Sequence, residues 1–168
     1  FIWHDLKSPI SDLLSKQIWD VDVILHLAAW SHVDRSIDYP MEFVMDNIIW
    51  TVNLLDYART LKNLKLFNYF STDEVYWDAP DWVDFVEWSP HKPRNPYSAS
   101  KAWAEDMCYA YRNTYKLPIF ITNTMNVFGE MQHPEKFIPL VIRKVLNEEE
   151  VIIHSHPNLE RAWSRFYI

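Results

Sequence analysis

The sequence predicts an α/β protein built around a largely parallel sheet. Short apolar runs alternate along the chain with longer stretches whose apolar residues recur at helical spacing, a pattern typical of strands joined by crossover helices. Residues 22–29 form a nearly continuous apolar run, as expected of a strand that is covered on both faces. With 168 residues, 49% of them hydrophobic and 23% charged, the chain is long enough to bury a core of its own.

The expected elements follow one another without an internal repeat, a low-complexity segment or a linker. The first six residues have the pattern of a strand that is already under way. Pro40 and Pro96 each begin a long helical stretch, because proline fits the first position of a helix. After the strand at 22–29, we expect a helix at 40–61, a strand at 64–71, a loop at 72–95, a helix at 96–115, a strand at 118–122, a helix at 135–147 and a strand at 151–154.

Composition argues against several classes of function. The net charge of −7 and the isoelectric point near 5.4 disfavour nucleic acid or an anionic membrane as a partner, since both require a basic face. No apolar run approaches the roughly 20 residues that span a bilayer. The single cysteine, Cys108, cannot form an internal disulfide, so we expect a cytoplasmic protein. His154 and His156 lack further ligands nearby, and no metal site is expected.

Tyr97 and Lys101 form the first pair with chemical potential. They lie four residues apart in a predicted helix and therefore share one face of it. A phenol has a pKa of about 10, and a nearby ammonium favours the phenolate. The pair could thus supply a general base, although two surface residues one helical turn apart would give the same pattern.

Thr72, Asp73 and Glu74 follow directly on the predicted strand at 64–71. Ligands of open parallel sheets bind just beyond the carboxyl ends of the strands. Two adjacent carboxyl groups at such a place can differ in pKa, so that one acts as an acid and the other as a base. A solvated loop carrying two charges is the simpler alternative. The occurrence of both motifs in one chain favours an enzyme.

Several motifs in order resemble the extended short-chain dehydrogenase/reductase (NAD-dependent epimerase/dehydratase) family and, within it, the dTDP-glucose 4,6-dehydratases. The Tyr-x-x-x-Lys motif is shared across the superfamily, whereas Ser-Thr-Asp-Glu-Val-Tyr is more specific, because sibling epimerases and decarboxylases usually lack the Asp-Glu pair. The similar segments are HLAAWSHVDRSI, FVMDNIIWTVNLL, FSTDEVY, NPYSASKAWAED and MNVFGEMQHPEKFIP, which together span essentially the whole chain.

The resemblance implies a Rossmann-like, doubly wound parallel sheet that is only partly present. Residues 1–168 would be the interior part of an NAD(P)-binding domain, and a substrate-binding region would begin near residue 126. The N-terminal phosphate-loop unit and the C-terminal substrate lobe would be missing. Because that loop holds the pyrophosphate of the cofactor, we expect this fragment alone to bind NAD poorly and to be inactive.

The resemblance also implies a reaction, the NAD-dependent dehydration of a nucleotide-hexose such as dTDP-glucose to its 4-keto-6-deoxy form. Tyr97 would take the proton from the C4 hydroxyl while a hydride passes to NAD. Lys101 would lower the pKa of Tyr97 and bind the nicotinamide ribose. Glu74 would remove the C5 proton, Asp73 would protonate the departing C6 hydroxyl, and Thr72 would hydrogen-bond the sugar. Alternatives are a sibling epimerase or decarboxylase, or a non-catalytic module that binds NAD or a nucleotide-sugar.

Further positions match binding residues of the family. The helices at 40–61 and 97–115 would also pair across a two-fold axis, so a homodimer is implied. The expected cofactor contacts are Asp5 and Leu6 at the adenine and Leu27, Ala28 and Ala29 along the dinucleotide, in addition to Tyr97 and Lys101. The expected substrate contacts are Ser31 near the sugar and Asn126, Lys136 and Phe137 at the nucleotide-sugar, in addition to Thr72.

The tryptophan content is abnormal. At a usual share of about 7%, a chain of this length would carry roughly 12 glycines, yet it has 1 glycine and 9 tryptophans. We hypothesise that the gene uses UGA as a glycine codon and is translated here with UGA as tryptophan. The alternative is true enrichment, which needs seven independent insertions of a bulky side chain. Set beside the family pattern, the tryptophans at 19, 30, 50, 77, 82, 103 and 163 fall where a small residue is expected, whereas Trp3 and Trp88 do not.

Overall fold

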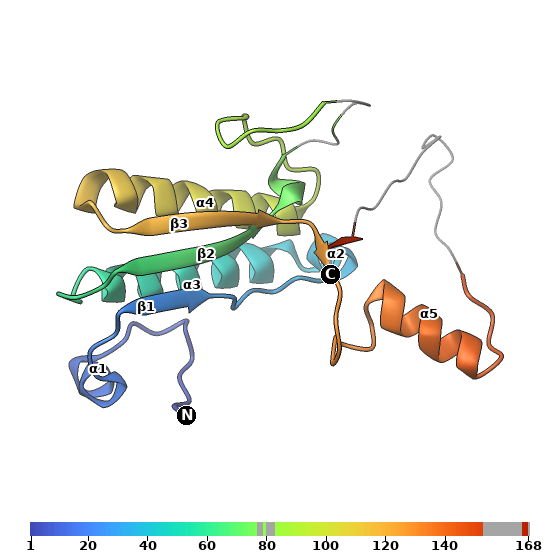
Figure 1. Ribbon diagram of the computed structural model, residues 1–168, viewed down its shortest axis with the longest axis horizontal. Coiled ribbons are helices and arrows are strands. Elements are labelled where there is room, and N and C mark those ends of the chain that lie inside the picture. The colour runs from blue at the N-terminus through green and yellow to red at the C-terminus, as the bar shows by residue number, and fades with distance from the viewer. Residues whose placement is uncertain (77–78, 80–82, 153–165, 168) are drawn as a thin grey trace. The chain divides into compact units, whose positions relative to one another are not determined.

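The computed structural model describes residues 1–76, 79, 83–152 and 166–167, and it divides into two units, Phe1–Thr124 and Met125–Ile168. In the first unit, three parallel strands form a sheet, and their spatial order follows the chain (Figure 1). The strands are β1 (Val23–His26), β2 (Leu66–Thr72) and β3 (Ile119–Thr124). The prediction of an α/β protein with a parallel sheet is confirmed.

Two long helices, α3 (Pro40–Ala58) and α4 (Pro96–Tyr115), lie side by side on one face of this sheet (Figure 1). Each begins with the predicted proline at its first position. A capping box also fixes the start of α4, because Asn95 accepts from the Ser98 backbone and Ser98 reaches back to the Asn95 backbone. The buried core between helices and sheet consists of Leu55, Ala58, Phe67, Tyr69, Ala104, Cys108, Tyr111 and Ile119.

The opposite face of the sheet is open among the described residues. Successive side chains of a strand point to opposite faces, so only every second one meets α3 and α4. Leu25 of β1 and Phe120 of β3 point the other way and are 57% and 59% exposed. The prediction of a strand covered on both faces at 22–29 is therefore wrong for the part of the chain that is described.

Short elements account for most other differences from prediction. The helices α1 (Asp12–Ile18) and α2 (Val33–Asp38) and the short helix η1 (Asp73–Val75) were not expected, and the first six residues form no strand. The Asp5–Leu6 segment is instead held by a turn, in which the Ser8 amide donates 2.9 Å to the Asp5 carbonyl. Of the strand expected at 151–154, residues 151 and 152 belong to no strand, and the remainder lies outside the described residues.

The second unit contains the expected helix, α5 (Phe137–Leu146), and a two-stranded parallel pair. In that pair β4 (Asn126–Val127) lies beside β5 (Phe166–Tyr167). No helix in the described ranges of either unit is long and apolar enough to cross a membrane.

The four described tryptophans that stand where a small residue is expected fall into two groups. Trp19 ends α1 with φ 69° and ψ −168°, a backbone region that is essentially restricted to glycine. Trp50 buries its indole nitrogen without a hydrogen-bond partner. By contrast, the Trp30 indole donates a 2.7 Å hydrogen bond to Asp46, and Trp103 lies half-exposed on α4. Trp77, Trp82 and Trp163 lie outside the described residues.

Candidate active site

Thr72, Asp73 and Glu74 lie at the carboxyl end of β2, where the chain turns into η1. The Thr72 hydroxyl accepts a 3.3 Å hydrogen bond from the Glu74 amide and donates a 3.2 Å hydrogen bond to the Asp73 carboxylate. Asn95, which caps α4, donates a 3.1 Å hydrogen bond to the Glu74 carboxylate. The start of α4 is thereby tied to the carboxylate pair, two residues before Tyr97.

Tyr97, in the first turn of α4, lies within electrostatic reach of this pair. Burial raises the pKa of Tyr97 to about 12, and the charges of Glu74 and Asp73 contribute to the rise while a hydrogen bond with Thr72 opposes it. Burial also raises the pKa of Asp73, against hydrogen bonds from Thr72 and from the backbone that lower it. The structure thus brings together a phenol, a hydroxyl and two carboxyl groups, of which Asp73 holds its proton more firmly than an ordinary aspartate.

The ammonium of Lys101 lies against β2. It donates a 2.6 Å hydrogen bond to the Phe70 carbonyl and lies 4.2 Å from the centre of the Tyr69 ring. Burial lowers the pKa of Lys101 to about 8. The pKa of Tyr97 lies above its ordinary value, because burial and the charges of the neighbouring carboxylates outweigh the hydrogen bond with Thr72, so the lowering by Lys101 stays a prediction.

Buried polar residues beneath the site were missed by the sequence reasoning. Asn47 of α3 accepts a 2.8 Å hydrogen bond from the Trp30 amide, and it donates to the Trp30 carbonyl (3.1 Å) and the Ser100 hydroxyl (2.9 Å). It therefore joins the segment after β1 to α4. His26 hydrogen-bonds Thr51 at 2.9 Å, and burial, followed by the charge of Lys101, lowers its pKa to about 3. A usable signal was the presence of polar residues on the otherwise apolar face of the helix at 40–61.

A pocket of about 440 Å³ collects part of the predicted cofactor contacts. Asp5, Leu6 and Ala28 line it, whereas Leu27 and Ala29 do not. Asn53 of α3 donates a 2.7 Å hydrogen bond to the Leu6 carbonyl and so fixes one wall. The other lining residues are Trp3, His4 and Trp50.

The predicted substrate contacts are spread over both units. Ser31 is exposed on the segment between β1 and α2 of the first unit. Asn126 is exposed in β4, Lys136 precedes α5 and Phe137 begins it, so these three belong to the second unit. Tyr97, Thr72 and Ser31 belong to the first unit, so the predicted substrate contacts are divided between the two units.

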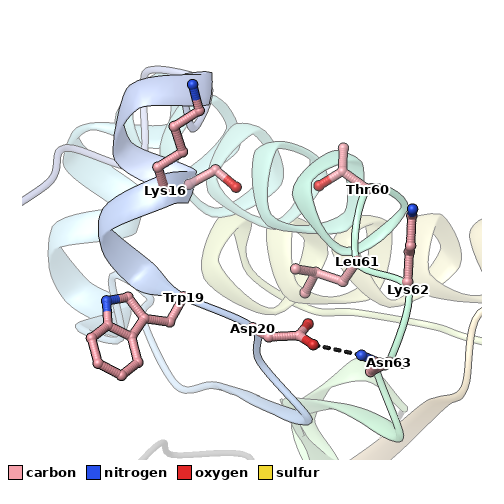
Figure 2. Close-up of a pocket in the computed structure, with 8 residues that line it drawn as sticks. Lys16, Trp19, Asp20, Thr60, Leu61, Lys62 and Asn63 are labelled. Atoms are coloured by element: carbon pink, nitrogen blue, oxygen red, sulfur yellow. Dashed lines mark hydrogen bonds between the residues drawn. The ribbon is translucent and has the colours of Figure 1, made fainter.

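Another pocket, of about 410 Å³, lies at the end of β2 away from Thr72, between the end of α1 and the turn after α3. Figure 2 shows Lys16, Asp20 and Lys62 around it, and the hydrogen bond of 2.5 Å from Asn63 to Asp20. None of the predicted site residues lines this pocket. Among the described residues, no group of three or more His, Cys, Asp or Glu side chains could hold a metal ion.

Comparisons with known proteins show the family of this chain. The model of the NAD dependent epimerase/dehydratase family matches residues 4–164. The low-salt glycan biosynthesis protein Agl12 of Haloferax volcanii is 43% identical over 163 residues, which are 97% of this chain and 51% of that protein. The chain spans about half the length of the curated relatives it matches.

Two kinds of enzyme occur among similar solved structures. The dTDP-glucose 4,6-dehydratase DesIV of Streptomyces venezuelae, solved with NAD bound, has a TM-score of 0.77 and 39% identity over 86% of this chain and 44% of its own. The UDP-N-acetylglucosamine 4-epimerase of Methanobrevibacter ruminantium, in complex with UDP-N-acetylmuramic acid, has a TM-score of 0.79 and 28% identity over 92% of this chain and 50% of its own.

Proposed function

Because the chain belongs to the NAD-dependent epimerase/dehydratase family, we propose that the protein containing it removes water from a nucleotide-hexose and forms the 4-keto-6-deoxy sugar. The supporting observation is the Asp73–Glu74 pair beside Tyr97. Eliminating water requires a base at one carbon and an acid at the next, and two carboxyl groups of unequal pKa can supply both. Since similar dehydratases act on dTDP-glucose, that sugar nucleotide is the first substrate to test.

NAD is the cofactor in this proposal, and it supplies a hydride acceptor that returns the hydride later in the same turnover. The pocket formed by Asp5, Leu6 and Ala28 fits the adenosine end, because it combines apolar walls with a carboxylate that can accept hydrogen bonds from ribose hydroxyls or an exocyclic amine. Asn53 and the 3.0 Å ion pair between Lys7 and Asp46 hold these walls against α3.

Tyr97 takes the proton of the sugar C4 hydroxyl. A phenol with a pKa of about 12 is a poor acid, so its phenolate must be stabilised when the sugar is bound. Lys101 occupies the same helix face and is the cation that can do this once its ammonium leaves the Phe70 carbonyl. With its pKa lowered by burial to about 8, Lys101 is still mostly protonated at neutral pH and can serve as this cation.

Glu74 and Asp73 carry out the elimination. Glu74, oriented by Asn95, removes the C5 proton that the neighbouring keto group has acidified. Asp73, whose pKa is raised by burial, donates a proton to the departing C6 hydroxyl, which leaves as water. Through its hydroxyl, Thr72 holds the Asp73 carboxyl group and the Glu74 backbone amide at the end of β2.

Incubation of the whole protein with dTDP-glucose and related nucleotide-hexoses, followed by mass spectrometry, tests the proposal. A product lighter by one water supports the dehydratase. The second candidate function is 4-epimerisation, which the similar epimerase structure favours and which leaves the mass unchanged while the sugar configuration inverts. If neither product forms although nicotinamide cofactor is bound, the protein is a binding module.

We further propose that the protein works in the cytoplasm as a homodimer through α3 and α4. Met41 and Met45 form one exposed apolar strip on α3. An apolar strip of this kind on a helix that packs beside another suits a helix-on-helix interface. Sedimentation equilibrium of the whole protein and of a Met41→Lys/Met45→Lys variant tests this, since only the variant should be monomeric.

A further inference from the structure

Glu105 is a completely buried acid on α4, one helical turn beyond Lys101. A buried carboxylate must be paired, because an isolated charge is far less stable inside a protein than in water. Its oxygens accept hydrogen bonds from Asn123 of β3 at 2.9 Å and from His91 at 3.3 Å. The function proposed above leaves this buried group without a role.

His91 connects Glu105 to one end of the carboxylate motif. It belongs to the loop that runs from η1 to α4, and it also contacts Asp106 at 3.1 Å. The next residue of this loop, Lys92, donates a 2.9 Å backbone hydrogen bond to Val75 in η1. Farther along, Asn95 holds the Glu74 carboxylate. The loop that carries His91 thus contacts η1 through Lys92 and the Glu74 carboxylate through Asn95.

Asn123 connects Glu105 to the other end of the motif. Its side-chain amide donates to the Glu105 carboxylate and also lies 3.4 Å from the Thr72 carbonyl. Thr72 in turn holds Asp73 and Glu74 through its hydroxyl. The buried Glu105 carboxylate is thus linked to both ends of the Thr72–Glu74 segment. One link runs through the loop that carries His91, and the other runs through Asn123 of β3.

The contact between His91 and Glu105 favours the charged form of both side chains. Burial would raise the pKa of Glu105, but hydrogen bonds led by that from His91 outweigh it, and the pKa lies below its ordinary value. The hydrogen bond to Glu105 raises the pKa of His91 against the effect of burial. The ion pair is therefore lost either when pH rises through the raised pKa of His91 or when it falls through the lowered pKa of Glu105.

We propose that Glu105 is a positioning residue, which holds Thr72 and Glu74 at the angle needed for elimination through Asn123 and the His91 loop. The inference rests on the proposed function, since it assigns Glu74 to the removal of a proton. Glu105 itself touches neither substrate nor cofactor in this proposal. The other titratable groups that face the pair are Lys101, Asp106, Cys108 and Tyr109 on α4, Tyr69 on β2 and Tyr76 after η1.

The test compares Glu105→Gln with wild type in the whole protein, by the transient absorbance of reduced nicotinamide and by water loss from the sugar. Displacing a catalytic group by about 1 Å can slow its step about 100-fold. We expect elimination to slow about 10- to 100-fold, so that reduced cofactor accumulates, while oxidation and the substrate KM change less than about threefold. The alkaline fall in elimination rate that follows His91 should disappear in Glu105→Gln.

Two further variants serve as controls. Asp106→Asn removes the exposed partner of His91 on the same helix and should behave like wild type. His91→Gln leaves Glu105 in place and should reproduce the elimination defect, and the double variant should be no slower than either single one, because both act through one contact. Should Glu105→Gln unfold too readily to assay, His91→Gln carries the same comparison.

The outcomes separate the inference from the function on which it rests. If wild type removes no water from any nucleotide-hexose, the proposed function fails and the role of Glu105 fails with it. The other case is that wild type does remove water. If Glu105→Gln and His91→Gln then slow oxidation and elimination equally, or slow neither step, the positioning role alone is overturned.

Discussion

The ammonium of Lys101 donates a 2.6 Å hydrogen bond to the backbone carbonyl of Phe70 at the end of β2. Only 4% of this residue is exposed, and burial lowers its pKa from 10.5 to about 8. Lys101 therefore carries its charge at a cost to the fold. Such a cost is typical of a residue that serves catalysis at the expense of stability, and the free energy of unfolding measures it.

Replacing Lys101 by methionine should stabilise the protein near neutral pH. Between about pH 8 and pH 10.5 the unfolded state binds more protons at this residue than the folded state, so its contribution to the free energy of unfolding rises with pH. Below this window the variant should exceed wild type by up to about 3 kcal/mol, and the difference should vanish near pH 10.5. Urea unfolding across this range measures it.

Lys65→Met is the matched control. Lys65 is exposed and paired with Asp22 at 2.9 Å, and that hydrogen bond raises its pKa. Its replacement should not stabilise the protein at any of these pH values. A stability difference for Lys101→Met that stays constant with pH would contradict the assignment of the cost to a buried charge.

The two stages of the proposed reaction should separate by mutation. Tyr97→Phe removes the group that accepts the first proton, so no enzyme-bound reduced cofactor should appear. Asp73→Asn and Glu74→Gln should leave that oxidation within about tenfold of wild type but slow elimination by about 10²–10⁴. Rapid-mixing absorbance distinguishes the cases, and an equal loss of oxidation in all three variants would contradict the division of roles.

Asn47 should be among the most costly polar residues to remove. Asn47→Ala leaves the Trp30 amide and carbonyl and the Ser100 hydroxyl short of a partner in a buried place. We expect a loss of about 2–4 kcal/mol in the free energy of unfolding. Asn53→Ala, which removes one half-buried hydrogen bond to Leu6, should cost about 1 kcal/mol. Equal losses of stability in the two variants would show that Asn47 contributes no more than a single half-buried hydrogen bond does.

The long elements could be predicted because each carried a local signal over many residues. The helices beginning at Pro40 and Pro96 combined a proline start with several turns of helical spacing, and both occur where expected. The helix Asp12–Ile18 has only seven residues, too few for a periodic signal, and its Ser11 cap shows only in the 3.3 Å hydrogen bond to Leu14.

The residues of the candidate site could be predicted from the sequence, but their hydrogen-bond partners could not. The carboxylate pair and Tyr97 lie at one edge of the sheet because the end of a parallel strand and the start of the next helix meet there. The hydrogen-bond partner of Lys101, by contrast, depends on how closely α4 packs against β2, which no local sequence pattern predicts. The same holds for His91 and Glu105, since the loop between positions 83 and 95 has no periodicity that would show which face its histidine presents.

The structure at two tryptophan positions provides independent evidence on whether the gene encodes glycine there. Trp19 has a φ of 69° with ψ −168°, a conformation that costs a non-glycine residue about 1–3 kcal/mol. Figure 2 shows its indole at the end of α1, and 81% of the residue is exposed, so little burial offsets this cost. The buried indole nitrogen of Trp50 has no hydrogen-bond partner, and Trp50 lines the pocket proposed for adenosine.

We therefore expect glycine at positions 19 and 50 in the native host, together with 30, 77, 82, 103 and 163. In recombinant protein, Trp19→Gly should raise the free energy of unfolding by about 1–3 kcal/mol through relief of backbone strain. Trp88→Gly is the control, since Trp88 is equally exposed but has no positive φ, and glycine there should lower stability by about 0.5–1 kcal/mol. Peptide mass spectrometry on protein from the source cells reads each position directly. Tryptophan at 19 and 50 in an active native enzyme would refute the recoding and leave true enrichment as the explanation.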